Sequence, residues 1–483
     1  MSTILVLGST GYVGGRLVPR LIERNHTVRC LVRDRRKLDG KPWRQQVEVF
    51  EGDALNPESI GSAFDGVEVV YYLIHSMASG EGSFEKLDHQ AAGNVANIAA
   101  RADVKRIVYL GGLGRRDTTQ SAHLRSRHQT GDTLRRGKVP VTEFRAAVIV
   151  GSGSVSFELI HHLVNRLPVM ICPRWVYTRT QPIAIADVLQ YLVRAIDTPE
   201  TVGKTIDIGG PEILTYRDMM LITGKVLGLR RLLVEVPVLT PRLSSYWVNL
   251  VTPIPAGLAR ALIEGLRYET VCENDDALRL FDIKPMSFAE AVSRALARVR
   301  DYRVETRWTD ASSRLEQPPI DPSHLKIDRR TVRVNAPADT TFSVIRAIGG
   351  NTGWYYGSWL WKLRGFIDQQ LGGVGLRRGR RHPTDIAVGD ALDFWRVEEY
   401  VAGEKLILRA EMKVWGQAWL EFSVKSQADN HSLLAQTARY YPRGLFGLVY
   451  WYGVYPIHVA VFRGMVKAIA KRAEREYMTK QTE

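Results

Sequence analysis

The chain has 483 residues, 45% of them hydrophobic, which is too long for one ordinary domain and predicts two or three domains with real cores. The net charge of +15 comes without zinc-finger spacing, a basic zipper or an aromatic RNA-binding signature, so we expect no nucleic-acid partner. The three cysteines, Cys30, Cys172 and Cys272, have neither metal nor redox spacing, which fits a reducing compartment and argues against a disulfide framework; we expect no metal site.

The first sixteen residues predict a strand, a tight turn and a helix, in that order. Residues 4–7 are an apolar run, the turn follows at once, and apolar residues then recur at helical spacing. In this context Gly8 permits the turn, Gly11 lets the backbone approach a diphosphate, and Gly14 lets helix pack on strand. Because helix-start amides attract anions, we expect a nicotinamide dinucleotide to be held by Gly8, Ser9, Thr10, Gly11, Tyr12, Val13 and Gly14.

The chain enters this first strand without a basic segment or a long apolar leader. Secretory signals have both features, so the sequence predicts a cytoplasmic protein.

The end of the second predicted strand, residues 27–32, indicates the cofactor type. An acidic residue at this point would bind the free 2′-hydroxyl of NAD(H), but the chain has Arg33, with Asp34 one residue later. An arginine fork suits a 2′-phosphate by charge and by geometry. We therefore expect NADP(H), with NAD(H) the less favoured cofactor; a solvated basic turn over residues 33–37 is the structural alternative.

Strands and helices then alternate as in a doubly wound α/β Rossmann sheet. Strands are expected at residues 47–50, 67–73, 106–110 and 141–146, with a helix at 84–102. Asp53 and Ala54 follow the first of these strands, where the adenine ring should lie. His75 follows the next, near the crevice where such folds bind ligands, although a purely structural histidine fits there as well.

Three segments carry a resemblance to a known superfamily: the turn at 8–14, Gly52-Asp53-Ala54, and residues 145–151. Over about its first 300 residues the chain resembles the extended or atypical short-chain dehydrogenases/reductases. It is most similar to the atypical branch that includes NmrA-like regulators and the Rossmann-type accessory subunit of respiratory complex I. Residues 181–188 and 209–212 look like that family's substrate-domain signatures, so the resemblance implies a small substrate domain before residue 300.

The resemblance also implies an active-site tyrosine and a lysine four residues later, and this chain lacks that pair. No tyrosine occurs between Tyr109 and Tyr177, and His123 and Arg127 stand where the pair is expected. Four residues apart on a helix, they share a face. His123 can relay a proton near neutral pH and Arg127 can hold ribose or phosphate, unless His123 is a surface histidine and the site is silent.

Composition changes after residue 300, where residues 301–325 are proline-rich and polar and predict a linker between domains at 1–300 and 326–475. A leading strand, a helix, strand-like runs at 391–397, 406–414, 418–424 and 433–440, and a long closing helix suggest an α+β helix-grip domain. Its motifs, such as Gly353-Trp354-Tyr355-Tyr356, resemble those of a START-like domain family of unknown function fused behind such reductases. Its seven tryptophans line a ligand cavity or fill a core, and Arg396 with Glu411 is a candidate buried ion pair or polar anchor.

Two apolar stretches bear on ligands and membranes. Residues 233–241 and 247–262 are interrupted by proline and either wall a pocket for a hydrophobic small molecule or form a core. Residues 444–462 carry no charged side chain and approach the length that spans a bilayer, but three glycines, Pro456 and His458 favour a helix packed on its own sheet. Peripheral membrane contact, aided by the basic surface, stays open.

These features predict an NADP(H)-binding, reductase-like protein: an oxidoreductase that acts on a carbonyl or hydroxyl of an apolar substrate, with His123 as the proton relay. The rival is a non-catalytic nucleotide sensor or assembly protein. The missing tyrosine favours the rival, and the second ligand-type domain favours the enzyme.

Overall fold

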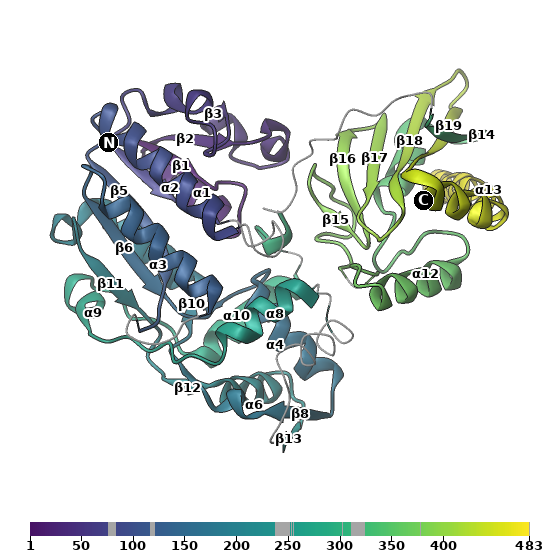
Figure 1. Ribbon diagram of the computed structural model, residues 1–483. Helices are drawn as coiled ribbons and strands as arrows, with labels where there is room; N and C mark the ends of the chain where they lie inside the picture. Colours follow the sequence, from purple (N-terminus) through teal and green to yellow (C-terminus); the bar gives the residue numbers. More distant parts are fainter. Residues whose placement is uncertain are drawn as a thin grey trace. The chain divides into compact units, whose positions relative to one another are not determined.

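The computed structural model describes residues 1–75, 84–115, 121–236, 252, 254, 256–301, 303–310, 324–376 and 378–482. It divides into two compact units, residues 1–312 and 313–483, and each is described by itself (Figure 1).

The first unit is built on a seven-stranded parallel sheet in the order β3-β2-β1-β4-β5-β6-β11. This order, with reversal beside β1, is that of a doubly wound Rossmann sheet, so the predicted α/β class is confirmed. The strands are β1 (Thr3–Leu7), β2 (Thr27–Val32), β3 (Glu48–Glu51), β4 (Val69–Tyr72), β5 (Arg106–Gly112), β6 (Val141–Ala146) and β11 (Thr205–Ile208).

Helices cover both faces of this sheet. Helices α1 (Gly14–Ile22) and α5 (Ile185–Arg194) pack on the face that carries Ile4 and Val6, whereas α2 (Phe84–Arg101) and α3 (Ala122–Arg135) pack on the face that carries Leu5 and Leu7. Residues buried on both faces explain why the strands read as continuous apolar runs. The carboxyl ends of β1, β4 and β5 therefore meet at one edge, where ligands of such sheets bind.

A smaller lobe follows β6 within the first unit. Its core includes Phe157, Met219 and Val292 from three different helices. Of the predicted pocket walls at 233–241 and 247–262, residues 237–241, 247–251, 253 and 255 lie outside the described residues, whereas Ile254 and Ala259 are buried against Leu159 in a small core. The elements after β6 are β7 (Ile149–Val150), α4 (Val155–Arg166), β8 (Val169–Pro173), β9 (Arg179–Thr180), β10 (Ile183–Ala184), β12 (Leu214–Thr215), α6 (Tyr216–Val226), β13 (Leu232–Val236), α8 (Ala256–Gly265), α9 (Asp276–Leu280) and α10 (Phe288–Arg300).

Part of the predicted linker, residues 303–310, lies against the first unit, and we call it the strap. The Thr306 hydroxyl accepts from Nε of Arg16 and donates to the carbonyl of Tyr12, both at 2.8 Å. The Trp308 indole donates to Glu158 at 2.8 Å. The first unit therefore continues past residue 300, and residues 311–323 lie outside the described part of the chain.

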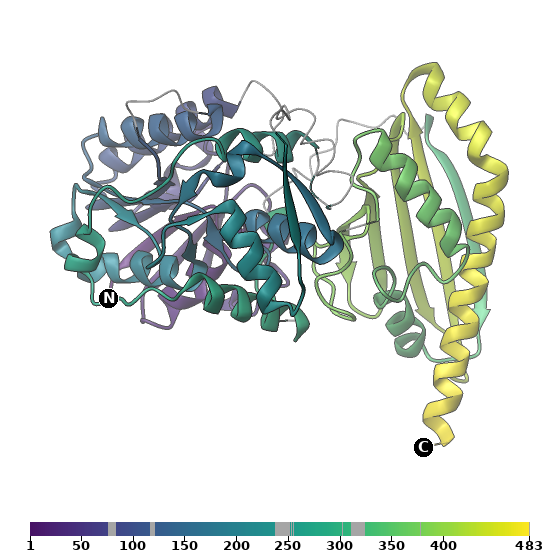
Figure 2. The same cartoon turned by 90° about the horizontal axis from the view of Figure 1, so that it is seen from below.

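The described part of the second unit is a six-stranded antiparallel sheet with three helices. Its strand order is β14-β19-β18-β17-β16-β15, and α13 packs along it against β14, β19 and α11, as Figure 2 shows from the side. The sheet and closing helix of an α+β domain are thus present, whereas the START-like classification stays a prediction. The elements are β14 (Lys326–Val334), α11 (Ala338–Arg346), α12 (Ser358–Gln370), β15 (Ala391–Leu392), β16 (Trp395–Val401), β17 (Lys405–Ala410), β18 (Gly416–Ser426), β19 (Ser432–Pro442) and α13 (Gly444–Thr482); α12 was not predicted.

Aromatic rings fill the core of this second unit. Trp354 lies 5.3 Å from Trp361 and 6.1 Å from Phe394 between ring centroids, and Trp395 joins the same cluster. With Trp419, which is also buried, four of the seven tryptophans are therefore core residues.

The charged groups that the sequence singled out in this unit are paired internally. Arg396 binds Glu411 at 3.0 Å, which confirms the predicted ion pair, and Arg378 binds the same carboxylate. Arg381 pairs with Asp390 at 3.2 Å. Arg378 and Arg381, which belong to the basic run Arg377-Arg378-Gly379-Arg380-Arg381, thus bind acidic side chains of their own unit.

Helix α13 has two unlike halves. Among the described residues it is the one helix that is long and apolar enough, over Gly444–Gln481, to cross a membrane by length and composition alone. Met465, Ile469 and Ala473 in its second half, beyond the run 444–462 that was expected to pack on the sheet, are fully buried in the core of the unit. Its first half is largely exposed.

Candidate functional site

The glycine turn has the geometry that a diphosphate needs. Gly8 has φ of +91°, and a Cβ there would lie 2.7 Å from the Leu73 carbonyl oxygen; a Cβ at Gly14 would lie 2.2 Å from the Gly8 oxygen. Both positions therefore require glycine. Helix α1 begins after Val13 without a side-chain cap. The Gly15 and Arg16 amides donate to the carbonyls of Gly11 and Val13, so the amides of Val13 and Gly14 are the ones left for an anion. The residues present thus fit a dinucleotide.

Two side chains of the turn point into the protein instead. Ser9 is fully buried. The Tyr12 ring lies under the Arg16 guanidinium, whose central carbon is 4.6 Å from the ring centroid, and burial raises the pKa of this phenol. These side chains brace the turn from inside, so main-chain amides would carry its contact with the cofactor. Thr10 and Val13 are half-buried on the same turn.

Arg33 and Asp34 differ in their surroundings. Arg33 is exposed just after β2, and no interaction ties its guanidinium to another described residue. Asp34 accepts from the backbone amide and from Nε of Arg36, each at 3.0 Å, and from Nη2 at 2.8 Å. Burial opposes ionisation of Asp34, but the bonds from Arg36 outweigh it and hold the pKa below its usual value.

Asp53 and Ala54 lie near the same end of the sheet. The Gly52 amide donates to the carbonyl of Val32 at 2.9 Å, which places Asp53 beside the end of β2. Asp53 accepts from the Leu55 amide at 3.0 Å, and Ala54 is buried with its carbonyl bonded to Asn94 of α2. Asp53 is thus positioned by a local turn.

The structure brings His75 and His123 into contact, together with an acid that sequence reasoning missed. Nδ1 of His75 lies 3.1 Å from the Asp88 carboxylate, and Nε2 of His75 lies 3.2 Å from Nδ1 of His123. The Ser126 hydroxyl also donates to Asp88, at 3.0 Å. The available signal was that Asp88 is a lone acid on the face of α2 that buries Ala91, Ala92 and Val95.

We call Asp88, His75 and His123 the relay. Their hydrogen bonds determine which ring nitrogen of each histidine carries a proton. A carboxylate only accepts, so His75 donates to Asp88 from Nδ1, and its Nε2 accepts from Nδ1–H of a neutral His123. Nε2 of His123 is then an acceptor. No hydrogen bond to a described residue occupies this nitrogen.

Both histidines are held neutral. Burial lowers the pKa of His75, although the bond to Asp88 opposes the shift. Burial and the adjacent His75 and Arg127 hold the pKa of His123 well below 6.5. At neutral pH the free ring nitrogen of His123 is therefore unprotonated and is available to a substrate proton.

Arg127 is turned toward the sheet. Its guanidinium donates to the Leu110 carbonyl and lies 5.9 Å from the centroid of the Tyr109 ring. The Tyr109 hydroxyl in turn donates to the carbonyl of Arg127 at 2.9 Å. Arg127 thus fixes α3 on β5, and its contact with a ribose or phosphate stays a prediction.

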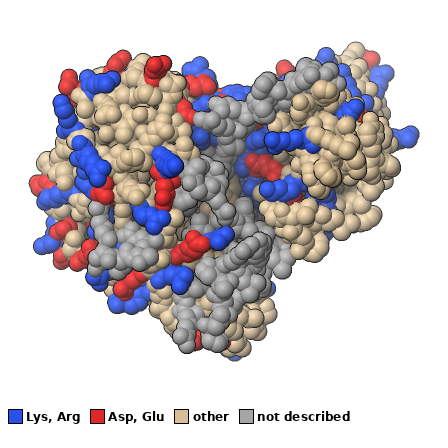
Figure 3. Space-filling view, viewed as in Figure 1, with Lys and Arg blue, Asp and Glu red and all other residues tan. Residues whose placement is uncertain are grey.

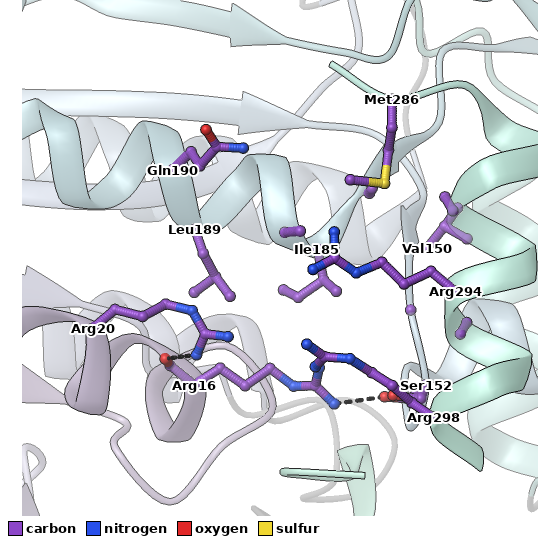
Figure 4. A pocket seen from close by; sticks show the side chains of 15 residues that line it. Arg16, Arg20, Val150, Ser152, Ile185, Leu189, Gln190, Met286, Arg294 and Arg298 are labelled. Carbon is purple, nitrogen blue, oxygen red and sulfur yellow. Dashed lines mark hydrogen bonds between the residues drawn. The ribbon is translucent and has the colours of Figure 1, made fainter. Parts of the chain in front are cut away.

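A separate cavity of about 240 Å³ lies between α1, α5 and α10 (Figure 4). Four arginines line it, but none of the predicted site residues does. Arg16 donates to the carbonyl of Ser152 at 2.7 Å, and Arg20 and Arg298 both bind Glu305 of the strap. Three of the arginines that line the cavity, Arg16, Arg20 and Arg298, therefore bind the strap. Among the described residues, no group of three His, Cys, Asp or Glu side chains could hold a metal ion.

Two family models match separate parts of the chain. Residues 8–142 match a family described as NAD(P)H-binding, and residues 322–465 match a family described as a protein of unknown function (DUF2867).

Curated relatives and solved structures resemble the first unit. Photosystem II assembly factor Ycf39 of Trieres chinensis is 25% identical over 214 residues, which are 43% of this chain and 64% of that protein. NADH dehydrogenase [ubiquinone] 1 alpha subcomplex subunit 9 of Arabidopsis thaliana is 25% identical over 223 residues, 44% of this chain and 55% of that protein. Citrobacter sp. triphenylmethane reductase, at 21% identity and a TM-score of 0.50, covers 61% of this chain and 99% of its own, and shares the fold.

The predicted resemblance is therefore confirmed at a coarse level. The first unit has an NAD(P)H-binding, reductase-like Rossmann fold similar to that of the atypical short-chain dehydrogenases/reductases, and residues 322–465 of the second unit are similar to a family of unknown function.

Proposed function

We propose that the first unit is an NADP(H)-dependent oxidoreductase that interconverts a hydroxyl and a carbonyl on an apolar substrate. The Asp88–His75–His123 chain carries this proposal, because it supplies a proton acceptor in place of the missing tyrosine. Leu73, whose carbonyl abuts the Gly8 turn, lies two residues before His75, so the relay is close to the proposed diphosphate site. Arg33 has no partner among the described residues, whereas the Asp34 carboxylate is bonded to Arg36. This difference supports NADP(H) over NAD(H).

In the oxidative direction, Nε2 of His123 takes the proton of the substrate hydroxyl. The developing imidazolium is stabilised because Nδ1–H remains bonded to His75, which Asp88 orients. Bound NADP⁺ would accept the hydride from the same carbon, so the C–H and O–H bonds are replaced by a carbonyl. In the reductive direction the imidazolium returns the proton to the carbonyl oxygen.

The test measures NADP⁺ reduction with 1-decanol and 1-phenylethanol, and NADPH oxidation with decanal and acetophenone. We expect His123→Gln to lower turnover at least roughly a hundredfold while the calorimetric affinity for NADPH is unchanged. Because the pKa of His123 lies well below 6.5, wild-type oxidation should not fall between pH 8 and pH 6.

His89→Gln is the matched control, since His89 is exposed on α2 beside Asp88. It should leave turnover unchanged. Equal turnover in His123→Gln and wild type would remove His123 from the mechanism.

The similarity to an assembly factor and to a respiratory-complex subunit favours a second candidate function, a nucleotide-binding assembly protein. This candidate predicts that NADPH binds with measurable affinity and is consumed with none of the four substrates, in wild type and His123→Gln alike.

A further inference from the structure

Helix α12 in the second unit carries its apolar stripe on the outside. Trp359 is 67% exposed, and Leu363, Phe366, Ile367 and Leu371 are exposed on the same side, at the spacing of one helix face. Its one acid, Asp368, is fully buried and accepts from the backbone amides of Lys413 and Gly375. An apolar stripe of α12 is thus exposed while its acidic side chain is buried, which is the reverse of an ordinary surface helix.

The first half of α13 has the same property. Leu445 and Phe446 are each 74% exposed, and Val449 and Tyr452 are exposed one and two turns later. The opposite side of this half contacts the sheet, where the Trp451 ring stacks on Tyr440 at 5.3 Å. Exposed apolar side chains here are therefore not the result of an unpacked helix.

A loop joins these two helices into one surface. Arg364 of α12 donates to the Lys413 carbonyl at 2.8 Å, and Trp415, two residues later, lies 5.9 Å from Tyr450 of α13. Trp415 is itself 53% exposed. The surface, which we call the apolar face, comprises Trp359, Leu363, Phe366, Ile367, Leu371, Trp415, Leu445, Phe446, Val449 and Tyr452.

The charges beside the apolar face have one sign. Lys362, Lys413 and Arg443 are exposed next to it, whereas residues 444–462 contain no charged side chain. In Figure 3, the surface over α12 and the adjoining part of α13 is largely tan, the colour of uncharged residues. Monomeric soluble proteins rarely expose contiguous apolar surface of this kind.

We propose that the apolar face docks on the surface of an anionic lipid bilayer. Apolar side chains enter the headgroup boundary, tryptophan and tyrosine suit that interface, and the flanking cations bind acidic headgroups. A second copy of the chain would bring like cations together. On the side of α13 away from the apolar face, His458 lies 3.1 Å from Asp328, which favours a helix that lies at the membrane surface over one that crosses it. This inference does not depend on the proposed oxidoreductase function.

The test is co-sedimentation of the full chain with vesicles of phosphatidylglycerol and phosphatidylcholine in equal parts, or of phosphatidylcholine alone. We expect binding to the anionic vesicles to be at least roughly tenfold tighter, and to weaken at high salt. The pairs Leu363→Glu/Phe366→Glu and Phe446→Glu/Val449→Glu, one on each helix, should each lower that binding at least roughly tenfold.

Leu278→Glu and Ile327→Glu are matched controls, because the Leu278 and Ile327 side chains are exposed but lie outside the apolar face. They should bind as wild type does, and near-ultraviolet circular dichroism checks that every variant is folded. Failure of wild type to bind anionic vesicles, or equal loss in the controls, overturns the proposal. Two further outcomes also overturn it: vesicle-bound protein that resists carbonate extraction, which indicates a membrane-spanning helix, and a dimer in light scattering that the paired variants dissociate while no vesicle binding occurs.

Discussion

Arg33 and Asp34 are neighbours in the chain, but only one of them is available to a ligand. Both oxygens of Asp34 accept from the Arg36 side chain, so this acid would have to lose an ion pair before it could bind a ribose hydroxyl. Arg33 is exposed at the end of β2 and would lose nothing by turning to a 2′-phosphate. The proposed preference for NADP(H) therefore depends on a difference in pairing between adjacent side chains.

We expect Arg33→Ala to weaken NADPH binding about tenfold and to leave NADH binding unchanged, because only the 2′-phosphate loses a partner. Calorimetry at one salt concentration measures both affinities. Arg35→Ala, which removes another exposed arginine near Glu51, serves as the control. An equal loss of affinity for both nucleotides would contradict the assignment.

The Glu411 carboxylate links the β16–β17 hairpin to the loop that precedes it. Glu411 follows β17 and binds Arg396 of β16 and Arg378 from the preceding loop. Burial raises the pKa of Glu411, but the two guanidinium groups outweigh it and lower the pKa to about 2. Because this pKa is depressed on folding, the ion pair contributes stability above the unfolded value of 4.5 and loses it as pH falls toward 2.

Glu411→Gln should therefore lower the free energy of unfolding at pH 7 by an amount on the order of 3 kcal/mol. The difference from wild type should shrink at pH 3, where the wild-type carboxylate begins to lose its advantage. Denaturant unfolding followed by tryptophan fluorescence reports on this unit, which holds seven of the eleven tryptophans. Glu404→Gln, at an exposed position on the same hairpin, should have no such effect; a pH-independent difference would refute the ion-pair account.

At the scale of the whole molecule, each proposed site belongs to one unit. The glycine turn and the histidine relay lie within residues 1–312, and the apolar face lies within residues 313–483. Neither proposed site, as described, includes a residue of the other unit.

Changes at one site should therefore affect the proposed NADP(H)-dependent reaction and the proposed membrane binding separately. His123→Gln should bind anionic vesicles as wild type does, and Leu363→Glu/Phe366→Glu should bind NADPH with unchanged affinity, as titration calorimetry and co-sedimentation measure. Loss of nucleotide binding in the paired variant would show that the two sites are coupled.

The sequence by itself determined the parts of this protein that depend on neighbouring residues. The glycine turn, the alternation of apolar strands and helices in the first unit, and the strands of the second follow from local sterics and periodicity, which a single chain displays directly. Tertiary structure decided the rest. Asp88 lies in the site only because α2 and α3 pack on one face of the sheet. Residues 303–310 lie against the unit because the buried guanidinium of Arg16 donates to Thr306 as well as to Ser152. The exposure of the apolar stripe of α12 could not be predicted from the sequence either. An apolar stripe predicts burial, and only the surrounding contacts show which side of a helix is covered.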